Sequence, residues 1–247
     1  MLRLSAVVVP RKNKTGIYTV LAVVVLGITL ILSGGCVFGE QKVAKTEYYS
    51  YSDSFGANSY IIANSGEAAL IDTAAPEEIS RSLIEKKLKL KYIILSHGHF
   101  DHISGVETLV QQFPDARVLI HPADGDKLAD PAKNLSKGFG TNVAVQVTAS
   151  PLSAGKSLPL GSAQIEVIET PGHTVGSVTL WTGELLFTGD TLFKGSVGRT
   201  DFPGGSDEEL RVSLQKLLKL PDETVVLPGH GEPTTIGAEK RGNHYLD

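Results

Sequence analysis

Four apolar segments with the composition of β-strands each lead into a turn that carries histidine or aspartate. The segments are KYIIL, QIEVIET, ELLFTGD and TVVLPGH. KYIIL leads into SHGHFDH, which holds three of the chain's seven histidines, and the other segments lead to His173, Asp190 and His230. Side chains at strand ends face into loops, where binding and catalytic groups gather. Five histidines and two aspartates in such turns are hard to reconcile with core packing, so we expect the fold to gather them into one site.

Helical and strand-like patterns alternate between these segments. The pieces EYYSYS, NSYIIAN and AALIDTA resemble strands in the first half, and RVLIH and SVTLWTG follow later. Apolar residues at helical spacing predict helices over residues 76–88, 103–113 and 207–220. With 41% hydrophobic residues among 247, the chain can bury a sizeable core. The order of elements predicts an α/β sandwich, in which two sheets pack on each other and helices cover them.

The first 36 residues differ in kind from the rest. Basic residues come first, and the 16-residue segment Ile17–Leu32 carries no charge. A basic start, an apolar middle and small residues afterwards are typical of a signal peptide or a membrane anchor. The basic flank would stay on the cytoplasmic side, which places the rest of the chain on the extracytoplasmic side.

Cys36 is the only cysteine of the chain and follows Ser33-Gly34-Gly35. This setting resembles a lipoprotein processing site, in which the cysteine is lipidated. An uncleaved membrane-spanning helix is the alternative. In either case we expect a membrane-tethered protein, with residues 1–36 as signal or anchor, residues 37–46 as tether and residues 47–247 as the functional domain.

The part of the chain beyond Cys36 is acidic. It carries 19 basic and 27 acidic residues, a net charge of about −8. Binding to a nucleic-acid backbone requires a basic surface, so no nucleic-acid partner is expected and a nuclease is excluded. A single cysteine also excludes a disulfide within one chain.

The clustered side chains are of the types that hold catalytic metal ions. Imidazole and carboxylate groups suit zinc, iron or manganese, and a cluster without thiolates argues against a structural zinc-finger site. One catalytic ion needs about three protein ligands and a water. Seven ligands, one of them shared, would hold two adjacent ions, so we expect two divalent ions, with zinc preferred over iron or manganese.

The arrangement of these residues resembles the metallo-β-lactamase-fold hydrolases from about Glu47 to the C-terminus. The residues that carry the resemblance are His97, His99, Asp101 and His102, followed by His173, Asp190 and His230. The resemblance implies an αββα sandwich with the metals at one edge of the sheets. GDTLFKGSVGRTDFPGGS and LPGHGEPTTIGAE are further similar to the short, single-domain glyoxalase II-like group. We therefore expect no additional C-terminal helical domain of the kind that full-length glyoxalase II carries.

The resemblance also implies a role for each residue. His97, His99 and His173 would bind the first ion, Asp101, His102 and His230 the second, and Asp190 would bridge them. A hydroxide shared by two ions ~3.5–4 Å apart would attack the carbonyl carbon of a thioester, and a thiolate would leave. Asp101 is also expected to orient that hydroxide.

Other residues are expected to support substrate and ligands. Arg199 lies where glyoxalase II has a lysine that contacts a carboxylate of glutathione, and it would either hold a substrate carboxylate or pair with Asp201. Phe193 and Lys194 are expected to line the pocket. Asp72 resembles the family's acidic residue that orients a ligand histidine through its second nitrogen.

The sequence therefore predicts a membrane-tethered, dinuclear metallohydrolase that acts on a small-molecule thioester. A mononuclear iron persulfide dioxygenase on the same fold is the main alternative, and a lactonase or β-lactamase comes next. The alternative outside the enzymes is an exported binding lipoprotein with an inactive site.

Overall fold

The computed structural model describes residues 11–12, 18–19, 46–155 and 157–246. The predicted functional domain lies almost entirely within these ranges, whereas Cys36 and most of the predicted anchor and tether lie outside the described residues. Two short strands, β1 (Arg11–Lys12) and β2 (Tyr18–Thr19), pair antiparallel. Within the described ranges, no helix combines the length and apolarity that crossing a membrane requires.

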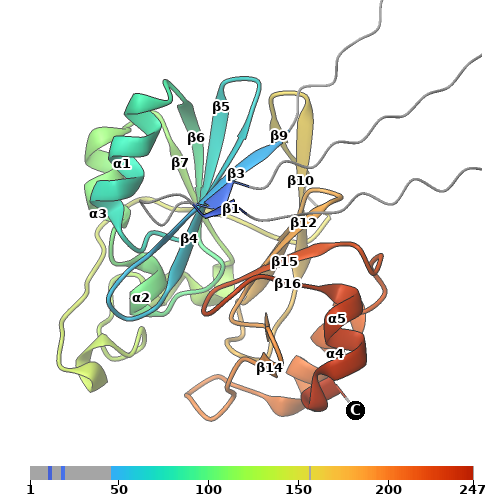
Figure 1. The fold of residues 1–247 in the computed structure, drawn as a ribbon. Helices are drawn as coiled ribbons and strands as arrows, with labels where there is room; N and C mark the ends of the chain where they lie inside the picture. Colours follow the sequence, from blue (N-terminus) through green and yellow to red (C-terminus); the bar gives the residue numbers. More distant parts are fainter. Residues whose placement is uncertain (1–10, 13–17, 20–45, 156, 247) are drawn as a thin grey trace, which may run out of the picture.

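Six strands form the first sheet, in the spatial order β3-β4-β5-β6-β7-β8 (Figure 1). They are β3 (Glu47–Ser52), β4 (Asn58–Asn64), β5 (Glu67–Ile71), β6 (Lys89–Ile94), β7 (Arg117–Ile120) and β8 (Ser150–Pro151). The pairs from β3 to β5 are antiparallel, and those from β5 to β8 are parallel. Because parallel neighbours end at the same edge of a sheet, the loops after β5 and β6 emerge side by side.

The second sheet also has six strands, in the order β16-β15-β12-β11-β10-β9. They are β9 (Ser157–Leu160), β10 (Ala163–Glu169), β11 (Val178–Trp181), β12 (Leu185–Gly189), β15 (Val225–Pro228) and β16 (Thr234–Thr235). Only β12 and β15 pair parallel among these neighbours. Their shared direction brings Asp190 and His230, which follow the two strands, to one edge. A separate hairpin joins β13 (Leu192–Phe193) and β14 (Ser196–Val197).

Helices cover the outer faces of both sheets. The α-helices are α1 (Pro76–Glu85), α2 (Phe100–Ile103), α3 (Val106–Gln112), α4 (Asp207–Leu217) and α5 (Ile236–Gly242). Short 3₁₀ helices are η1 (Pro122–Lys127), η2 (Ser136–Phe139) and η3 (His244–Leu246). Figure 1 shows α1 and α3 beside the first sheet and α4 and α5 beside the second. The expected αββα sandwich is confirmed.

The alternation of side chains along β4 explains how one strand serves two apolar layers. Tyr60 and Ile62 point into the layer between the sheets, where they meet residues such as Phe187. Ile61 and Ala63 point the other way, into the layer beneath α1 and α3. Successive side chains of a strand face opposite sides. A strand that is covered on both faces needs apolar side chains on both, as the four residues YIIA within NSYIIAN provide.

The predicted helix over residues 103–113 is interrupted in the structure. It is divided into α2 and α3 at Ser104 and Gly105. A Cβ atom on Gly105 would lie 2.2 Å from the backbone oxygen of Thr73, in the loop that follows β5. The close passage of that loop requires glycine and separates the two helices.

Other predicted elements differ at their ends. The helices predicted to reach residues 88 and 220 end at Glu85 and Leu217. Lys87 has a positive φ of 55°, which ends the helical path before β6 begins. The four-residue β9 and the seven-residue α5 were not predicted. Pro159 within β9 argues against a strand in the sequence, and a helix as short as α5 shows too few periodic positions.

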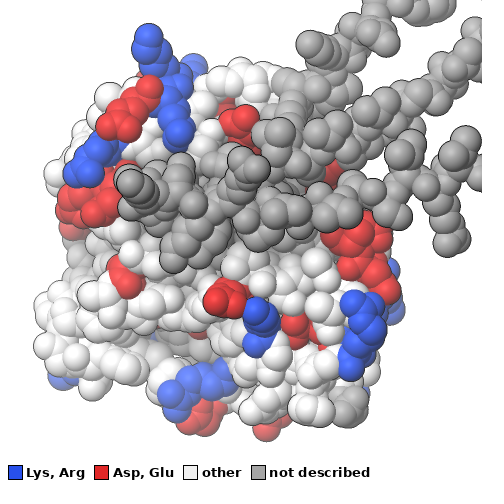
Figure 2. Space-filling model, in the orientation of Figure 1, with Lys and Arg blue, Asp and Glu red and all other residues white. Residues whose placement is uncertain are grey.

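The surface carries acidic and basic side chains in close alternation. Figure 2 shows Lys and Arg beside Asp and Glu across the face that it draws. Exposed ion pairs include Lys133 with Asp126 and Lys240 with Asp222, each at 2.6 Å. Such solvent-exposed pairs contribute little to stability, so the fold rests mainly on its three apolar clusters.

Candidate metal centre

All seven histidine and aspartate side chains selected from the sequence lie together, at the edge where strands of both sheets end. They form three overlapping groups, and within each group the potential ligand atoms lie within 4.8 Å of one another. The groups are His97, His99 and His173; His97, His102 and Asp190; and Asp101, His102 and His230.

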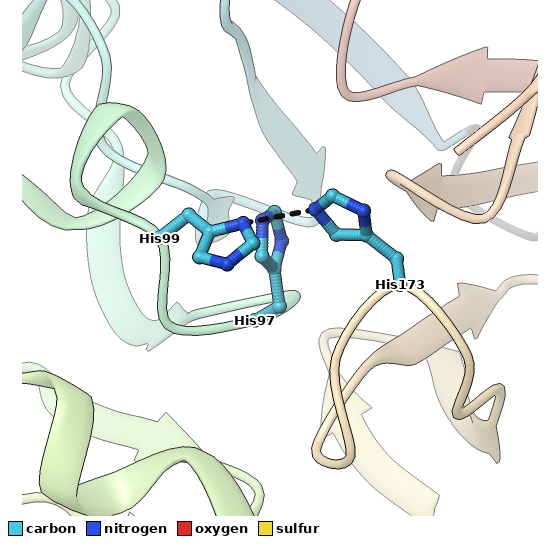
Figure 3. Close-up of side chains that lie close together, drawn as sticks. All are labelled: His97, His99 and His173. Atoms are coloured by element: carbon cyan, nitrogen blue, oxygen red, sulfur yellow. Dashed lines mark hydrogen bonds between the residues drawn. The ribbon is translucent and has the colours of Figure 1, made fainter. Parts of the chain in front are cut away.

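The first three histidines come from two loops. His97 and His99 follow β6, and His173 lies between β10 and β11. Figure 3 shows their rings turned toward one another, with Nδ1 of His99 2.9 Å from Nε2 of His173. The Nε2 atoms of His97 and His99 are buried without a hydrogen-bond partner. A buried polar atom without a partner is costly, so these two nitrogens fit a metal ion.

The remaining four side chains meet directly beside this group. Nε2 of His230 lies 3.2 Å from Oδ2 of Asp101 and 3.3 Å from Nε2 of His102. Asp190 stands between the two groups: its Oδ1 is 3.4 Å from Nε2 of His102, and its Oδ2 is 3.5 Å from Nε2 of His173. The Oδ1 atom is buried without a hydrogen-bond partner. Asp190 therefore has the position that a carboxylate shared by two ions needs.

Hydrogen bonds on the far side of the rings fix three of these histidines. Nδ1 of His102 lies 2.8 Å from Oδ2 of Asp72, and Nδ1 of His173 lies 2.7 Å from the backbone oxygen of Arg199. Nδ1 of His230 lies 2.9 Å from the backbone oxygen of Gly56. An acceptor at Nδ1 leaves Nε2 free to bind a metal. Asp72 thus lies where the family resemblance places the orienting carboxylate.

The electrostatic environment separates the histidines into two kinds. Burial, with nearby His173, lowers the pKa of His99 to about 3. Burial also lowers the pKa of His97 well below its ordinary value. His102 behaves oppositely: burial opposes its charge, but the carboxylates of Asp190 and Asp72 raise its pKa to about 10. His97 and His99 are therefore neutral near pH 7, the form that binds metals.

Asp124 is a buried residue of this site that the sequence did not reveal. It lies in η1 and accepts hydrogen bonds from Gly98 N at 2.8 Å, Thr174 Oγ1 at 2.7 Å and Gly176 N at 3.0 Å. Nζ of Lys127 donates a hydrogen bond to Oδ1 of Asp124 at 2.6 Å. Asp124 therefore joins the two loops that carry the first three histidines.

A cavity of about 370 Å³ opens over the cluster. Its remaining walls are largely aromatic, formed by Phe55, Phe100, Phe139, Phe193 and Phe202. Five of the chain's eight phenylalanines thus gather at one site. Phe193 alone among them was predicted to line the pocket, because five rings scattered along the chain show no common pattern.

The two basic residues expected near the substrate have different positions. Arg199 lines the cavity, and its guanidinium pairs with Asp201 through contacts of 2.6 and 2.5 Å. Lys194 is not among the lining residues, and its ammonium group lies 2.6 Å from Glu232 at the exposed surface. Of the two, only Arg199 is placed to meet a bound molecule.

Comparison with known proteins gives one family model and several relatives. Residues 53–230 match the model described as the metallo-beta-lactamase superfamily. An uncharacterized protein of Mycobacterium leprae is 40% identical over 208 residues, which cover 77% of this chain and 93% of the relative. Hydroxyacylglutathione hydrolase GloC of Haemophilus influenzae is 36% identical over 187 residues, which cover 73% of this chain and 87% of the relative.

Solved structures with the same fold agree with this match. BLEG-1, described as a B3 metallo-beta-lactamase, superimposes with a TM-score of 0.76 at 34% identity, covering 81% of this chain and 99% of its own. TTHA1623, solved in a di-iron-bound form, superimposes with a TM-score of 0.66 at 34% identity, covering 82% of this chain and 96% of its own. Both similarities span nearly the whole of the matched structures.

Proposed function

The chain belongs to the metallo-beta-lactamase superfamily, and from this membership we propose that it is a metal-dependent hydrolase that cleaves small-molecule thioesters. Membership and the histidine and aspartate cluster together imply divalent metal ions. We propose two ions per chain, with zinc preferred and iron or manganese as alternatives. Iron is included among the alternatives because the similar protein TTHA1623 was solved in a di-iron-bound form.

The observation that carries the proposal is the position of Asp190 between two sets of three side chains. Its two oxygens lie 3.4 to 3.6 Å from ring nitrogens of His102, His173 and His230. A site for one ion would need only three protein ligands and a water. The convergence of all seven side chains supports a pair of ions that share Asp190.

Two bound ions would lower the pKa of a nearby water and stabilise negative charge on the carbonyl oxygen. The protein's own residues orient the reactants. Asp101 lines the cavity, and although burial opposes ionisation, the hydrogen bond with His230 lowers its pKa. Its ionised carboxylate can therefore accept a hydrogen bond from the attacking water. The leaving thiolate needs no strong acid, because thiols ionise near neutral pH.

Similarity to GloC favours a thioester over the other substrates of this fold. The alternatives are a lactone or a β-lactam, the latter suggested by the similarity to BLEG-1, and a persulfide oxidised at a single iron. If the site held a single ion, the three side chains of Asp101, His102 and His230 would have no second ion to bind. Their close convergence therefore supports hydrolysis.

Metal analysis combined with activity assays tests the proposal. Protein reconstituted with zinc, manganese or iron is assayed on thioesters, lactones and β-lactams, and oxygen uptake is followed with a persulfide. We expect about two ions per chain and thioester hydrolysis that is lost in His99→Ala and Asp190→Ala. One iron per chain with persulfide-dependent oxygen uptake would overturn the proposal, as would full thioesterase activity in both variants.

A further inference from the structure

The aromatic rings above the metal centre form a continuous wall. Phe55 and Phe100 lie with centroids 5.2 Å apart, Phe100 and Phe139 at 5.4 Å, and Phe139 and Phe202 at 6.4 Å. Phe202 in turn contacts the ring of His99 at 5.9 Å. The wall therefore extends from the mouth of the cavity to a side chain of the metal centre itself.

The wall is assembled from distant segments and is partly open to solvent. Phe55 precedes β4, Phe100 begins α2, Phe139 ends η2 and Phe202 precedes α4. Phe55 and Phe139 are each 56% exposed. Large exposed apolar side chains that gather in one patch mark binding sites. Here the patch borders a cavity that contains the reactive centre.

Outside the metal centre, the side chains that line the cavity offer little positive charge to an anionic substrate. Apart from the metal-centre side chains, Arg199 is the only charged residue that lines it among the residues described. The Nε and Nη2 edge of its guanidinium already pairs with Asp201, and its Cζ lies 4.0 Å from the centroid of the Phe202 ring. A substrate carboxylate would have to displace Asp201 to form a two-point contact with that edge. The arginine instead extends the aromatic wall, since guanidinium groups stack on aromatic faces.

From this wall we infer that the site takes thioesters that carry a flat apolar group, such as an aromatic ring, beside the scissile carbonyl. The inference rests on the proposed function and specifies its substrate class. Phenylalanine pairs prefer edge-to-face or offset contacts, which a phenyl group can make with Phe139 and Phe202. The oxygen of water bonds to the carbonyl carbon, the carbon–sulfur bond breaks, and a carboxylic acid and a thiol are released.

Matched thioesters of one neutral thiol test this inference. The full chain with its metal is assayed with phenylacetyl and acetyl thioesters of N-acetylcysteamine, and with a lactoyl thioester of glutathione as the anionic comparison. We expect kcat/KM for the phenylacetyl thioester to exceed that for each of the other two by about tenfold or more. The preference for phenylacetyl over acetyl is expected to fall at least threefold in Phe139→Ala and in Phe55→Ala.

Tyr245→Ala is the control, because Tyr245 is an exposed aromatic residue, 65% accessible, that does not line the cavity. It should keep the wild-type preference, and circular dichroism confirms that each variant folds. A preference for the glutathione thioester, or a phenylacetyl preference unchanged in both Phe variants, would overturn the inference and leave the thioesterase proposal intact. Failure to hydrolyse any thioester would overturn the proposed function and this inference with it.

Discussion

Thr174, which directly follows His173 in the chain, donates a hydrogen bond from its Oγ1 to Oδ2 of Asp124 at 2.7 Å. The same carboxylate oxygen accepts the backbone N–H of Gly98, between His97 and His99. One buried atom therefore fixes the spacing of two loops that come from different sheets. Asp124 is a positioning residue: its carboxylate accepts hydrogen bonds from Gly98, Thr174 and Gly176, and it acts through the loops that carry the metal-centre histidines.

The exchange Asp124→Asn is expected to destabilise the fold and loosen the first three histidines. It removes the charge that pairs with buried Lys127. Leaving a buried charge unpaired costs about 3–5 kcal/mol, or roughly a 10 °C lower melting temperature for a domain of this size. Thermal unfolding and metal content are the measurements. Asp126→Asn, in the same 3₁₀ helix, breaks an exposed pair with Lys133 and should change neither; equal losses in the two variants would contradict the positioning role.

Gly229→Ala is expected to damage the metal centre by steric contact. A Cβ atom at this position would lie 2.2 Å from Oδ1 of Asp190 and 2.9 Å from Cε1 of His102. Displacement of Asp190 should weaken metal retention by about 10- to 100-fold, as for other changes that disturb ligand orientation. Titration against a chelator measures this. Gly125→Ala, where a Cβ would meet no atom within 4 Å, should retain metal like the wild type, and retention in Gly229→Ala would contradict the shared role of Asp190.

Metal binding near pH 7 is expected to release a proton from His102. The pKa of about 10 means that the metal-free ring is protonated at this pH, and the ion must displace that proton. Apparent affinity should therefore rise as pH increases toward 10. His99, with a pKa of about 3, is already neutral and contributes no such dependence. Calorimetry at pH 7 in two buffers of different ionisation enthalpy counts the protons, and a count of zero would show that His102 is neutral before the ion binds.

Membrane attachment through residues 1–36 remains a prediction, since Cys36 lies outside the described residues. Deletion of these residues is expected to move the protein from the membrane fraction to the soluble fraction. If a lipid on Cys36 holds the protein, Cys36→Ser does the same, whereas a spanning helix keeps that variant in the membrane. Cell fractionation with immunodetection distinguishes these cases. Full-length protein in the soluble fraction would disprove the attachment.

The ligand set was accessible from the sequence because its members lie in the segments that follow strand ends, although Asp101 and His102 fall within α2. His97 follows β6, Asp190 follows β12 and His230 follows β15, and apolar strands show as local patterns. The interruption between α2 and α3 was not accessible, because it depends on contact between Gly105 and Thr73. The sequence positions of those two residues differ by 32, and no local pattern reports such a contact.

The sequence by itself determined the sandwich architecture and the seven side chains of the metal centre, because strand periodicity and ligand chemistry are properties of short segments. Only the tertiary structure decided how those side chains are supported and what surrounds them. Asp124 meets partners 26 and 50 residues away, and five phenylalanines share one cavity. These relationships arise where loops from two packed sheets meet, so they depend on distances in space that the order of residues does not encode locally.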